Sequence, residues 1–407
     1  MVVPLPPRQV QLESDQFRAR QTLEALRFGI VPVEDVQTLT IGLEAEGVSL
    51  NRAIDRSRER GGDVLAVIGD YGFGKSHFIE LAAQRALQQN FIVMSASLDL
   101  VEVPPTRPRE IYRTLVASTR YPDSKHQGLH DLLKKAGDHS RVLNELMNIA
   151  PLGDACPLVM ALNALTMCGS QAAYEDIVQW ISGQIGATNE LRTCLKKPPA
   201  LYKVGEVARQ YGYLLTGISV LAHLVGYSGL AILIDESEHY SLLRVQQRER
   251  ADSFFKAMIY AAMGSERIAE DSIPYHYRVN YPFPFAARPN LFFLFALTES
   301  ENRLPVDQWL APSQLVRLDD RFIEKDIYRF MDTLADYHAL AYGYTPDGSQ
   351  HEIVESAPGM LARTLAQHRI NLRELIRTAV ALFDLLFLYD AFTPGEVLGE
   401  LADGLGL

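Results

Sequence analysis

One stretch of the sequence carries residues whose types and spacing fit the binding of phosphate groups. Gly69-Asp70-Tyr71-Gly72-Phe73-Gly74-Lys75-Ser76 matches the pattern G-x-x-x-x-G-K-[ST] at every fixed position. Gly72 and Gly74 let the backbone curl so that its N–H groups point inward at phosphate oxygens. We expect Lys75 to reach the β- and γ-phosphates and the Ser76 hydroxyl to ligate Mg²⁺. A glycine-rich turn that matches by chance is the alternative.

The residues on either side of this loop argue against a chance match. Residues 64–68 form a short apolar, β-branched run that is typical of a buried strand. Residues 77–87 have apolar side chains at helical spacing. A strand, a glycine loop and a helix in this order place the phosphate at a helix N-terminus, where the partial positive charge favours an anion.

A second apolar run ends in two acidic residues. Residues 230–234 are continuously apolar, as in a central parallel strand, and Asp235 and Glu236 follow them. The carboxyl ends of such strands face the ligand, so Asp235 is placed to hold Mg²⁺. Glu236 is placed to polarise a water that attacks the γ-phosphate, because phosphoryl transfer depends on positioning and charge neutralisation. The alternative is a strand that ends in surface acids.

Two further polar side chains are candidates for the same site. Residues 291–297 predict another buried strand, and Thr298 at its end can hydrogen-bond the attacking water or the γ-phosphate. Threonine is also common at strand ends without such a role. Near the C-terminus Asn371 is expected to cap a helix, and Arg373 in its first turn can reach back to the nucleotide.

A segment upstream of the phosphate loop, residues 40–46, is a candidate for contact with the nucleotide base. Gly42 would permit the close approach of a ring. A plain connecting turn explains the segment equally well.

The rest of the chain predicts the elements that position these residues. Two more strands, at 91–96 and 314–318, complete a five-stranded parallel sheet. Helices are expected at 17–28, 48–60, 109–119, 202–225, around 250–258, 322–342, 353–368 and 372–389, and several more between 121 and 228. Gly343 and Pro358-Gly359 are expected to interrupt the C-terminal helices.

Composition limits the class of protein. The chain has 407 residues, of which 47% are hydrophobic and 22% charged, as is ordinary for a globular protein. No apolar run reaches the length of a membrane span and the N-terminus has no signal pattern, so we expect a cytoplasmic protein. Its three cysteines, Cys156, Cys168 and Cys194, form no C-x-x-C pair, which favours reduced thiols over a disulfide frame or a zinc site.

The charge distribution leaves one place for contact with DNA. A net charge of −11 argues against a protein that coats nucleic acid. Residues 107–141 are nevertheless rich in arginine and lysine. This basic region fits either a DNA contact or a solvated helical face, and the second interpretation is favoured.

The phosphate loop, the strand ending in Asp-Glu, the strand ending in Thr and the arginine-bearing helix together resemble the AAA+ ATPase module, closest to its origin-recognition and STAND-like branches. That resemblance implies that Asp235 binds the metal, that Glu236 is the catalytic base, and that Thr298 and Arg373 act as sensors 1 and 2. More narrowly, residues 26–32 (LRFGIVP) and 69–78 resemble the ATP-binding proteins of BREX-type phage-defence clusters. The implied nucleotide contacts are Gly69, Tyr71, Gly72, Phe73, Gly74, Lys75, Ser76, His77 and Gly42.

The resemblance implies an α/β P-loop NTPase fold of AAA+ type with a helical insertion and a helical lid. The predicted division is an arm and helix at 1–40, the P-loop half of the core at 41–120, the insertion at 121–228, the second half of the core at 229–320, and a lid with an acidic tail at 321–407. An arginine finger cannot be chosen among Arg303, Arg317 and Arg321.

The expected function is ATP- and Mg²⁺-dependent switching or remodelling in a DNA-directed defence assembly. The expected protein partner is a helicase or another defence component. Self-association into a homo-oligomer is also possible on this resemblance. A nucleotide-binding scaffold or signalling module with little hydrolysis is the main alternative. A small-molecule kinase would need an acceptor pocket with its own base, of which the sequence has no sign.

Overall fold

The computed structural model describes residues 14–167, 169–186, 188–195, 198, 201, 207–274, 281–300, 302–319, 324–367, 371–389 and 396. Residues 1–13 of the predicted arm, Cys168, Arg321 and most of the acidic tail lie outside these residues. The chain divides into two compact units. Unit 1 comprises Met1–Glu44, Gly72–Glu80 and Asp319–Leu407, and unit 2 comprises Ala45–Tyr71 and Leu81–Leu318. The five-part division of the sequence stays a prediction.

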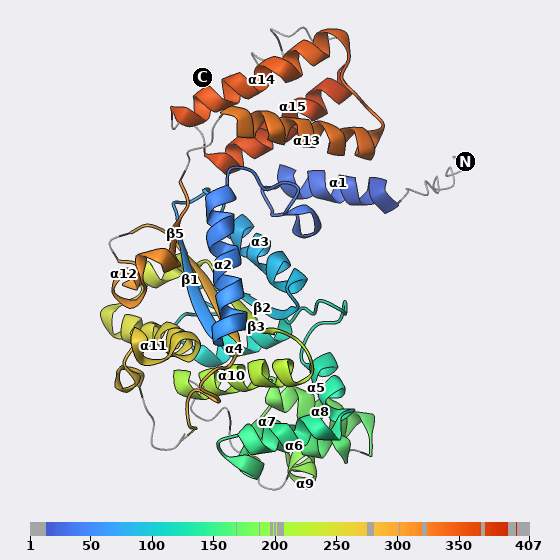
Figure 1. Ribbon diagram of the computed structural model, residues 1–407. Coiled ribbons are helices and arrows are strands. Elements are labelled where there is room, and N and C mark those ends of the chain that lie inside the picture. The colour runs from blue at the N-terminus through green and yellow to red at the C-terminus, as the bar shows by residue number, and fades with distance from the viewer. Residues whose placement is uncertain are drawn as a thin grey trace, which may run out of the picture. The chain divides into compact units, whose positions relative to one another are not determined.

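A five-stranded parallel sheet forms the centre of unit 2 (Figure 1). Its strands are β1 (Gly62–Ile68), β2 (Phe91–Ser97), β3 (Gly229–Asp235), β4 (Leu291–Leu297) and β5 (Leu315–Arg317). They lie in the order β2-β3-β4-β1-β5, and every neighbouring pair is parallel. The predicted mixed α/β fold with a five-stranded parallel sheet is therefore confirmed.

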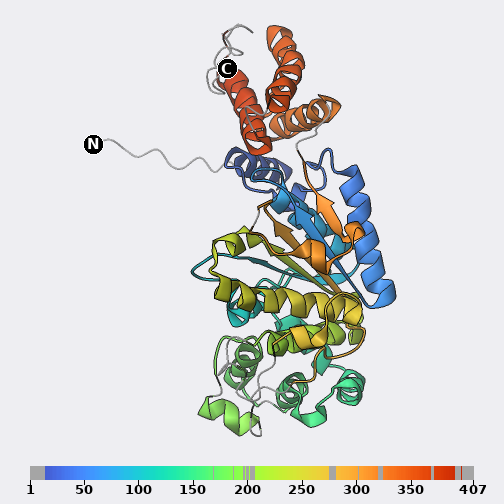
Figure 2. The ribbon, with the colours of Figure 1, turned by 90° about the vertical axis from the view of Figure 1, so that its left-hand side faces the viewer.

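The strands are buried on both faces, which explains their continuous apolar sequences. In β1, Val64, Ala66 and Ile68 join the main core, while Leu65 and Val67 on the other face are buried as well. Among the described residues, α4 (Pro108–Ala117) packs at β2, α10 (Ala208–Leu224) at β3, and α11 (Val245–Met263) at β1 and β4. Figure 2 shows α10 and α11 running beside one another below the strands.

Two helices flank the phosphate loop and its strand in sequence. They are α2 (Glu44–Arg60), which starts four residues earlier than the predicted helix at 48–60, and α3 (Lys75–Gln88). In α2 the residues Leu50, Ala53 and Ile54 are buried, at the three- and four-residue spacing of one helix face.

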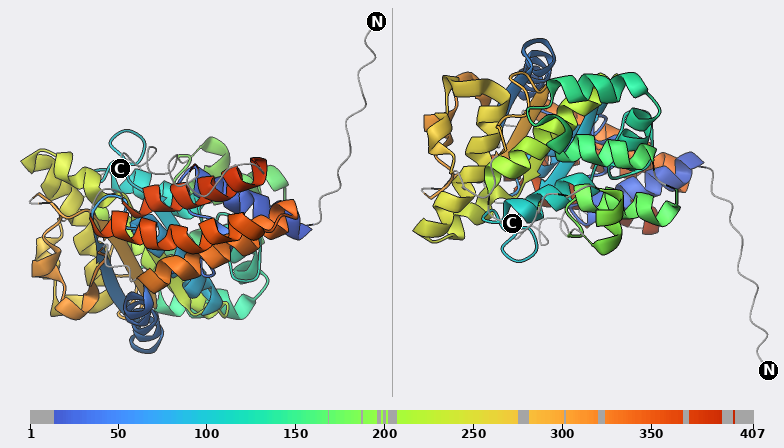
Figure 3. Two further views of the ribbon diagram at one scale, coloured as in Figure 1. Left: turned by 90° about the horizontal axis from the view of Figure 1, so that it is seen from above. Right: turned by 90° about the horizontal axis from the view of Figure 1, so that it is seen from below.

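Several helices lie between residues 121 and 228, as predicted, and their role as an insertion stays a prediction. They include α5 (His130–Gly137), α6 (Ser140–Ile149), α7 (Pro157–Thr166), α8 (Gln171–Ile181) and α9 (Asn189–Cys194), the green elements in the right panel of Figure 3. α5, α6 and α7 each contact α10. Gly217 lets α7 approach α10 closely, because a Cβ there would lie 2.6 Å from Cδ1 of Leu158. The helices of the predicted insertion therefore share the main core.

Unit 1 has a separate core made by four helices. They are α1 (Ser14–Arg27), α13 (Glu324–Tyr342), α14 (Gly348–Ala366) and α15 (Leu372–Leu388). The last three pack on one another, as the left panel of Figure 3 shows. Arg27 joins α1 to α15 through two N–H donors, Nε and Nη2, which lie 3.0 and 2.9 Å from the carboxylate oxygens of Asp384. Such bidentate pairs fix geometry as well as adding energy.

Two boundary predictions are wrong. Pro358-Gly359 does not interrupt the helix, because α14 continues through Pro358. A proline inside a helix loses one hydrogen bond and strains the preceding turn, but Ile353, Ala357 and Leu361 are buried around it, and that packing offsets the loss. The fifth strand is shorter than predicted, because Gln314 ends a 3₁₀ turn, η6 (Pro312–Gln314), instead of starting the strand.

Two further findings concern membrane association and thiols. Within the part of the chain that the structure describes, no helix has both the length and the apolar character needed to cross a bilayer. Cys156 is a buried free thiol and Cys194 an exposed one.

The start of β1 leaves no room for a side chain, which yields a test of the fold. A Cβ on Gly62 would lie 2.1 Å from the backbone oxygen of Ala262 in α11. We expect Gly62→Ala to lower the free energy of unfolding by about 1–3 kcal/mol, the usual cost of overpacking. Gly137→Ala is the control, because no atom lies within 4 Å of a Cβ built there. Unfolding midpoints in denaturant should separate the two variants, and equal midpoints would contradict this packing.

Candidate functional site

The phosphate loop has the backbone conformation that its glycines predict. It runs from Gly69, directly after β1, to Gly74, directly before α3. Gly72 and Gly74 have φ angles of +86° and +83°, a region that residues with a Cβ rarely adopt. Tyr71 is 64% exposed, and Phe73 is partly buried. The predicted order of strand, glycine loop and helix is therefore confirmed.

The two polar residues of the motif open α3. Lys75 is the first residue of this helix and is only 7% exposed, and Ser76 is the second. The helix begins at the loop, since Phe78 N donates to Gly74 O at 2.9 Å. The N–H groups of a helix's first turn have no partners within the helix and attract anions. The loop therefore has the donors that a phosphate needs.

His77, which is predicted to contact the nucleotide, is hydrogen-bonded within unit 1 to a residue close in sequence to Gly42. The Thr40 hydroxyl donates to Val36 O at 2.6 Å, so it accepts from His77 Nε2 at 2.8 Å. Burial lowers the pKa of His77 to about 4, because desolvation disfavours the charged imidazolium. His77 is thus a neutral donor that joins α3 to Thr40. Gly42 lies two residues after Thr40 and has a φ of +65°.

Arg373 is exposed and lies in the first turn of α15, where the sequence predicts it. The stem of its side chain lies against Gly29, because a Cβ on that glycine would be 3.0 Å from Cδ of Arg373 and 3.1 Å from Cγ. Gly29 has a φ of +69°. The arginine and the LRFGIVP segment, which is far from it in sequence, are therefore in contact within unit 1.

The two acids after β3 lie at the end of a central strand of unit 2. Asp235 is the last residue of β3, and its Oδ1 accepts from Glu236 N at 2.8 Å. Glu236 is exposed and has a φ of +55°. A left-handed conformation costs a residue with a Cβ roughly 1–2 kcal/mol.

Ser97 holds the carboxylate of Glu236, and the sequence analysis missed this residue. It ends β2, which pairs with β3 so that Ser97 lies opposite Asp235. Its hydroxyl donates to Glu236 Oε2 at 2.6 Å. Leu98 N also donates to Asp235 O at 3.1 Å. The sequence shows only a polar residue at the end of an apolar strand. It does not show which strand lies next to that residue in the sheet.

Thr298 follows β4, the strand between β1 and β3. Its Oγ1 is buried and has no hydrogen-bond partner among the described residues. Two atoms in the 3₁₀ turn η3 (Ser237–Leu242), which follows Glu236, are also buried without a hydrogen-bond partner among the described residues. They are Ser237 Oγ and His239 Nδ1. Buried polar atoms without a partner are rare and call for a water, an ion or a ligand.

Strand polarity brings several of the predicted residues to one edge of unit 2. Gly69, Asp235 and Thr298 each lie at the carboxyl end of a parallel strand, and β4 neighbours both of the other two strands. Gly69 N donates to Leu297 O, the residue before Thr298, at 3.1 Å. Ligands of parallel α/β sheets bind at this edge.

Three of the eight arginines and lysines in the basic region 107–141 form ion pairs among the described residues of unit 2. Arg113 contacts Glu110 at 2.8 Å, Lys135 contacts Asp123 at 3.0 Å, and Arg141 contacts Glu145 at 2.6 Å. Lys135 also lies 4.3 Å above the ring of Tyr227. These pairs agree with a solvated helical face, and a DNA contact stays a prediction.

The described candidates for an arginine finger share two acidic partners. Arg303 contacts Asp307 at 2.6 Å and Glu299 at 3.4 Å. Arg317 contacts the same acids at 3.5 and 3.0 Å. Their exposure separates them, since the side chain of Arg303 is 13% exposed and that of Arg317 is 56% exposed.

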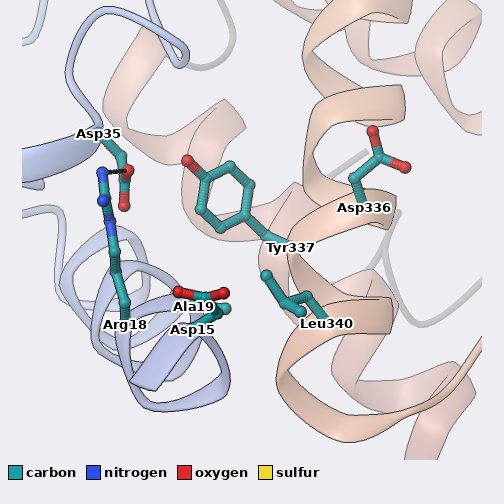
Figure 4. A pocket seen from close by; sticks show the side chains of 7 residues that line it. All are labelled: Asp15, Arg18, Ala19, Asp35, Asp336, Tyr337 and Leu340. Carbon is teal, nitrogen blue, oxygen red and sulfur yellow. Dashed lines mark hydrogen bonds and ion pairs between the residues drawn. The ribbon is translucent and has the colours of Figure 1, made fainter. Parts of the chain in front are cut away.

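A cavity of about 250 Å³ lies in unit 1 between α1, the 3₁₀ turn η1 (Val33–Asp35) and α13 (Figure 4). Arg18 and Thr22 of α1 both donate to Asp35 of η1. Burial raises the pKa of Asp35, but these hydrogen bonds outweigh it and hold the pKa below its ordinary value. The network ties α1 to η1, and none of the predicted site residues lines the cavity.

The fold and the site define a class of protein. A parallel α/β sheet with a glycine loop after β1, and with acids and an unpartnered hydroxyl at neighbouring strand ends, is compatible with a P-loop fold. The loop residues fit the phosphates of a nucleotide, because Gly72 and Gly74 curl the backbone and Lys75 follows them.

A family of known proteins matches the chain. The sequence model of the BREX system ATP-binding protein BrxC/D family matches residues 15–136 and 135–267, more than half of the chain. The chain belongs to this family, as the narrower resemblance predicts. Family membership supports an ATP-binding role in a phage-defence system. No curated protein matches the chain.

The depressed pKa of His77 predicts a pH dependence of stability. The unfolded chain binds a proton on this ring near the ordinary pKa of 6.5, whereas the folded chain does so only near 4. Between these values the unfolded state binds more protons, so stability falls as the pH is lowered through this window. The contribution is at most roughly 3 kcal/mol, at about 1.4 kcal/mol per pKa unit.

Denaturant unfolding at pH 7 and pH 4.5 tests this effect. His77→Gln should lose less stability between the two pH values than the wild type. His223→Gln is the control, since His223 is exposed at the end of α10 and should behave like the wild type. The assignment fails when the His77 variant and the wild type have the same pH dependence.

Proposed function

We propose that the protein is a Mg²⁺-dependent ATPase of AAA+ type that acts as a nucleotide-controlled switch or remodeller in a DNA-directed phage-defence assembly. The observation that carries this proposal is the position and conformation of Glu236. This residue follows Asp235 at the end of a central strand, has a left-handed backbone and accepts a hydrogen bond from Ser97. A side chain fixed in this way is suited to activating a water for attack on a phosphate.

Each part of the proposed site has a distinct role. The amides of the loop from Gly69 to Gly74 and the amine of Lys75 hold the phosphates. Ser76 and Asp235 hold the Mg²⁺, which neutralises charge on the phosphates when it is bound. Glu236 accepts a proton from the attacking water, and Thr298 hydrogen-bonds that water or the γ-phosphate.

The choice between a remodeller and a scaffold depends on turnover. A scaffold or signalling module would bind the nucleotide and scarcely hydrolyse it. The Ser97–Glu236 hydrogen bond favours hydrolysis, because binding alone does not need an oriented carboxylate. ATPase rates with and without DNA and the neighbouring defence proteins would separate the two functions.

The partners stay predictions. We propose a helicase or nucleic-acid-modifying component of the same defence system as the protein partner. The sequence also leads us to propose contact with DNA through residues 107–141, a homo-oligomer and a cytoplasmic location. Of the two described candidates for an arginine finger, Arg317 is the more exposed and is the one to test first.

Replacing Glu236 tests the proposed base. Glu236→Gln keeps the size of the side chain and removes its ability to accept a proton. We expect ATP hydrolysis to fall at least a hundredfold, the usual contribution of a general base, while the Kd for ATP changes little. Equal turnover in the variant and the wild type would reject Glu236 as the base.

Replacing Ser97 tests how Glu236 is positioned. Ser97→Ala removes the only hydrogen bond that the described side chains give to the Glu236 carboxylate. Such a bond contributes about 1 kcal/mol, so kcat should fall roughly three- to tenfold with unchanged ATP binding. Ser97→Thr keeps the hydroxyl and should restore the rate. A loss of ATP binding in Ser97→Ala would instead place Ser97 at the nucleotide.

A further inference from the structure

The start of α15 lies directly against the phosphate loop within unit 1. A Cβ built on Gly72 would lie 3.0 Å from Cγ of Asn371, 3.1 Å from its Oδ1 and 3.2 Å from its Cβ. A Cβ on Gly74 would lie 3.7 Å from Cδ2 of Leu372. The two glycines that curl the loop are therefore also the two that admit these side chains.

The next residue of α15, Arg373, is engaged elsewhere. Its Cγ, Cδ and Nε all lie within 3.5 Å of the position that a Cβ on Gly29 would take. Three successive residues, Asn371 to Arg373, thus each meet a glycine with a positive φ. Arg373 holds α15 on the segment after α1, and Asn371 is the residue placed on the phosphate loop.

The carboxamide of Asn371 has a fixed orientation and a spare donor group. Its Oδ1 accepts from Glu374 N at 3.0 Å, and its own backbone N donates to Glu374 Oε2 at 3.0 Å. This capping box holds the side chain in one rotamer. Among the described residues no hydrogen bond uses its Nδ2. The two N–H donors of Nδ2 therefore belong to a carboxamide whose Cγ and Oδ1 lie beside the proposed phosphate loop.

We infer that Asn371 is the residue of α15 that contacts the nucleotide, with its Nδ2 donating to a phosphate oxygen, and that Arg373 braces α15 on Gly29. The inference rests on the proposed nucleotide site. It differs from the role that the sequence resemblance gives to Arg373. It also couples the nucleotide to α15, because the same carboxamide caps the helix through Oδ1 and binds phosphate through Nδ2.

Two variants separate this role from simple capping. Ser, Asp and Asn cap helices about equally well, so Asn371→Ser and Asn371→Asp both keep α15 capped. Asn371→Ser removes the NH₂ donor, and we expect its Kd for ATP to rise about tenfold, the typical effect of losing a hydrogen bond to a charged group. Asn371→Asp places a negative charge beside the phosphates, and its Kd should rise further.

The experiment measures the Kd of fluorescent ATP and ADP analogues and the hydrogen exchange of the first turn of α15. ATP should protect that turn in the wild type and not in Asn371→Ser. Ser170→Ala, which removes the N-cap of α8 in unit 2, is the control and should leave both readouts unchanged.

Two results would overturn the inference. One is wild-type affinity and protection in both Asn371 variants. The other is a loss of affinity in Arg373→Ala that exceeds the loss in Asn371→Asp. Failure of the proposed nucleotide site has a different signature, because the wild-type protein itself would then bind neither ATP nor ADP.

Discussion

The parallel alignment of the five strands is the constraint on which the rest of unit 2 depends. In a parallel sheet all carboxyl ends meet at one edge, so residues far apart in sequence share one place without any further device. Ser97, Asp235 and Thr298 come from three neighbouring strands. Because both faces of the sheet are buried, a slip in register would disrupt the packing on both faces and separate these residues at the same time.

The sequence predicted the elements of this edge but not how they meet. The phosphate loop and the Asp-Glu pair are local signals, and their strands have long apolar runs, so both were found. The order β2-β3-β4-β1-β5 is a tertiary property. Without it nothing indicates that Ser97 faces Glu236, because a serine at the end of a strand is common. The same holds for the contact between Arg373 and Gly29.

Pro358 and His77 show the limits of local patterns. Pro358 predicts a helix break because helix propensity depends only on the local sequence. In the structure, buried neighbours on the same helix outweigh the lost hydrogen bond. His77 directly follows the loop motif, and its hydrogen bond to Thr40 depends on a segment more than thirty residues upstream. That bond gives the imidazole a structural partner, and its contact with the nucleotide stays a prediction.

The backbone at Glu236 bears on whether this site hydrolyses ATP or only holds it. The described non-glycine residues with a positive φ are Asn90, Asn290 and Glu236. Asparagine tolerates this conformation because its short side chain bonds locally, whereas glutamate does not. Two hydrogen bonds, from Glu236 N to Asp235 and from Ser97 to Glu236, offset a strain of roughly 1–2 kcal/mol. The conformation and the hydrogen bond from Ser97 hold one carboxylate directly after Asp235, which supports the proposed hydrolysis over the scaffold alternative.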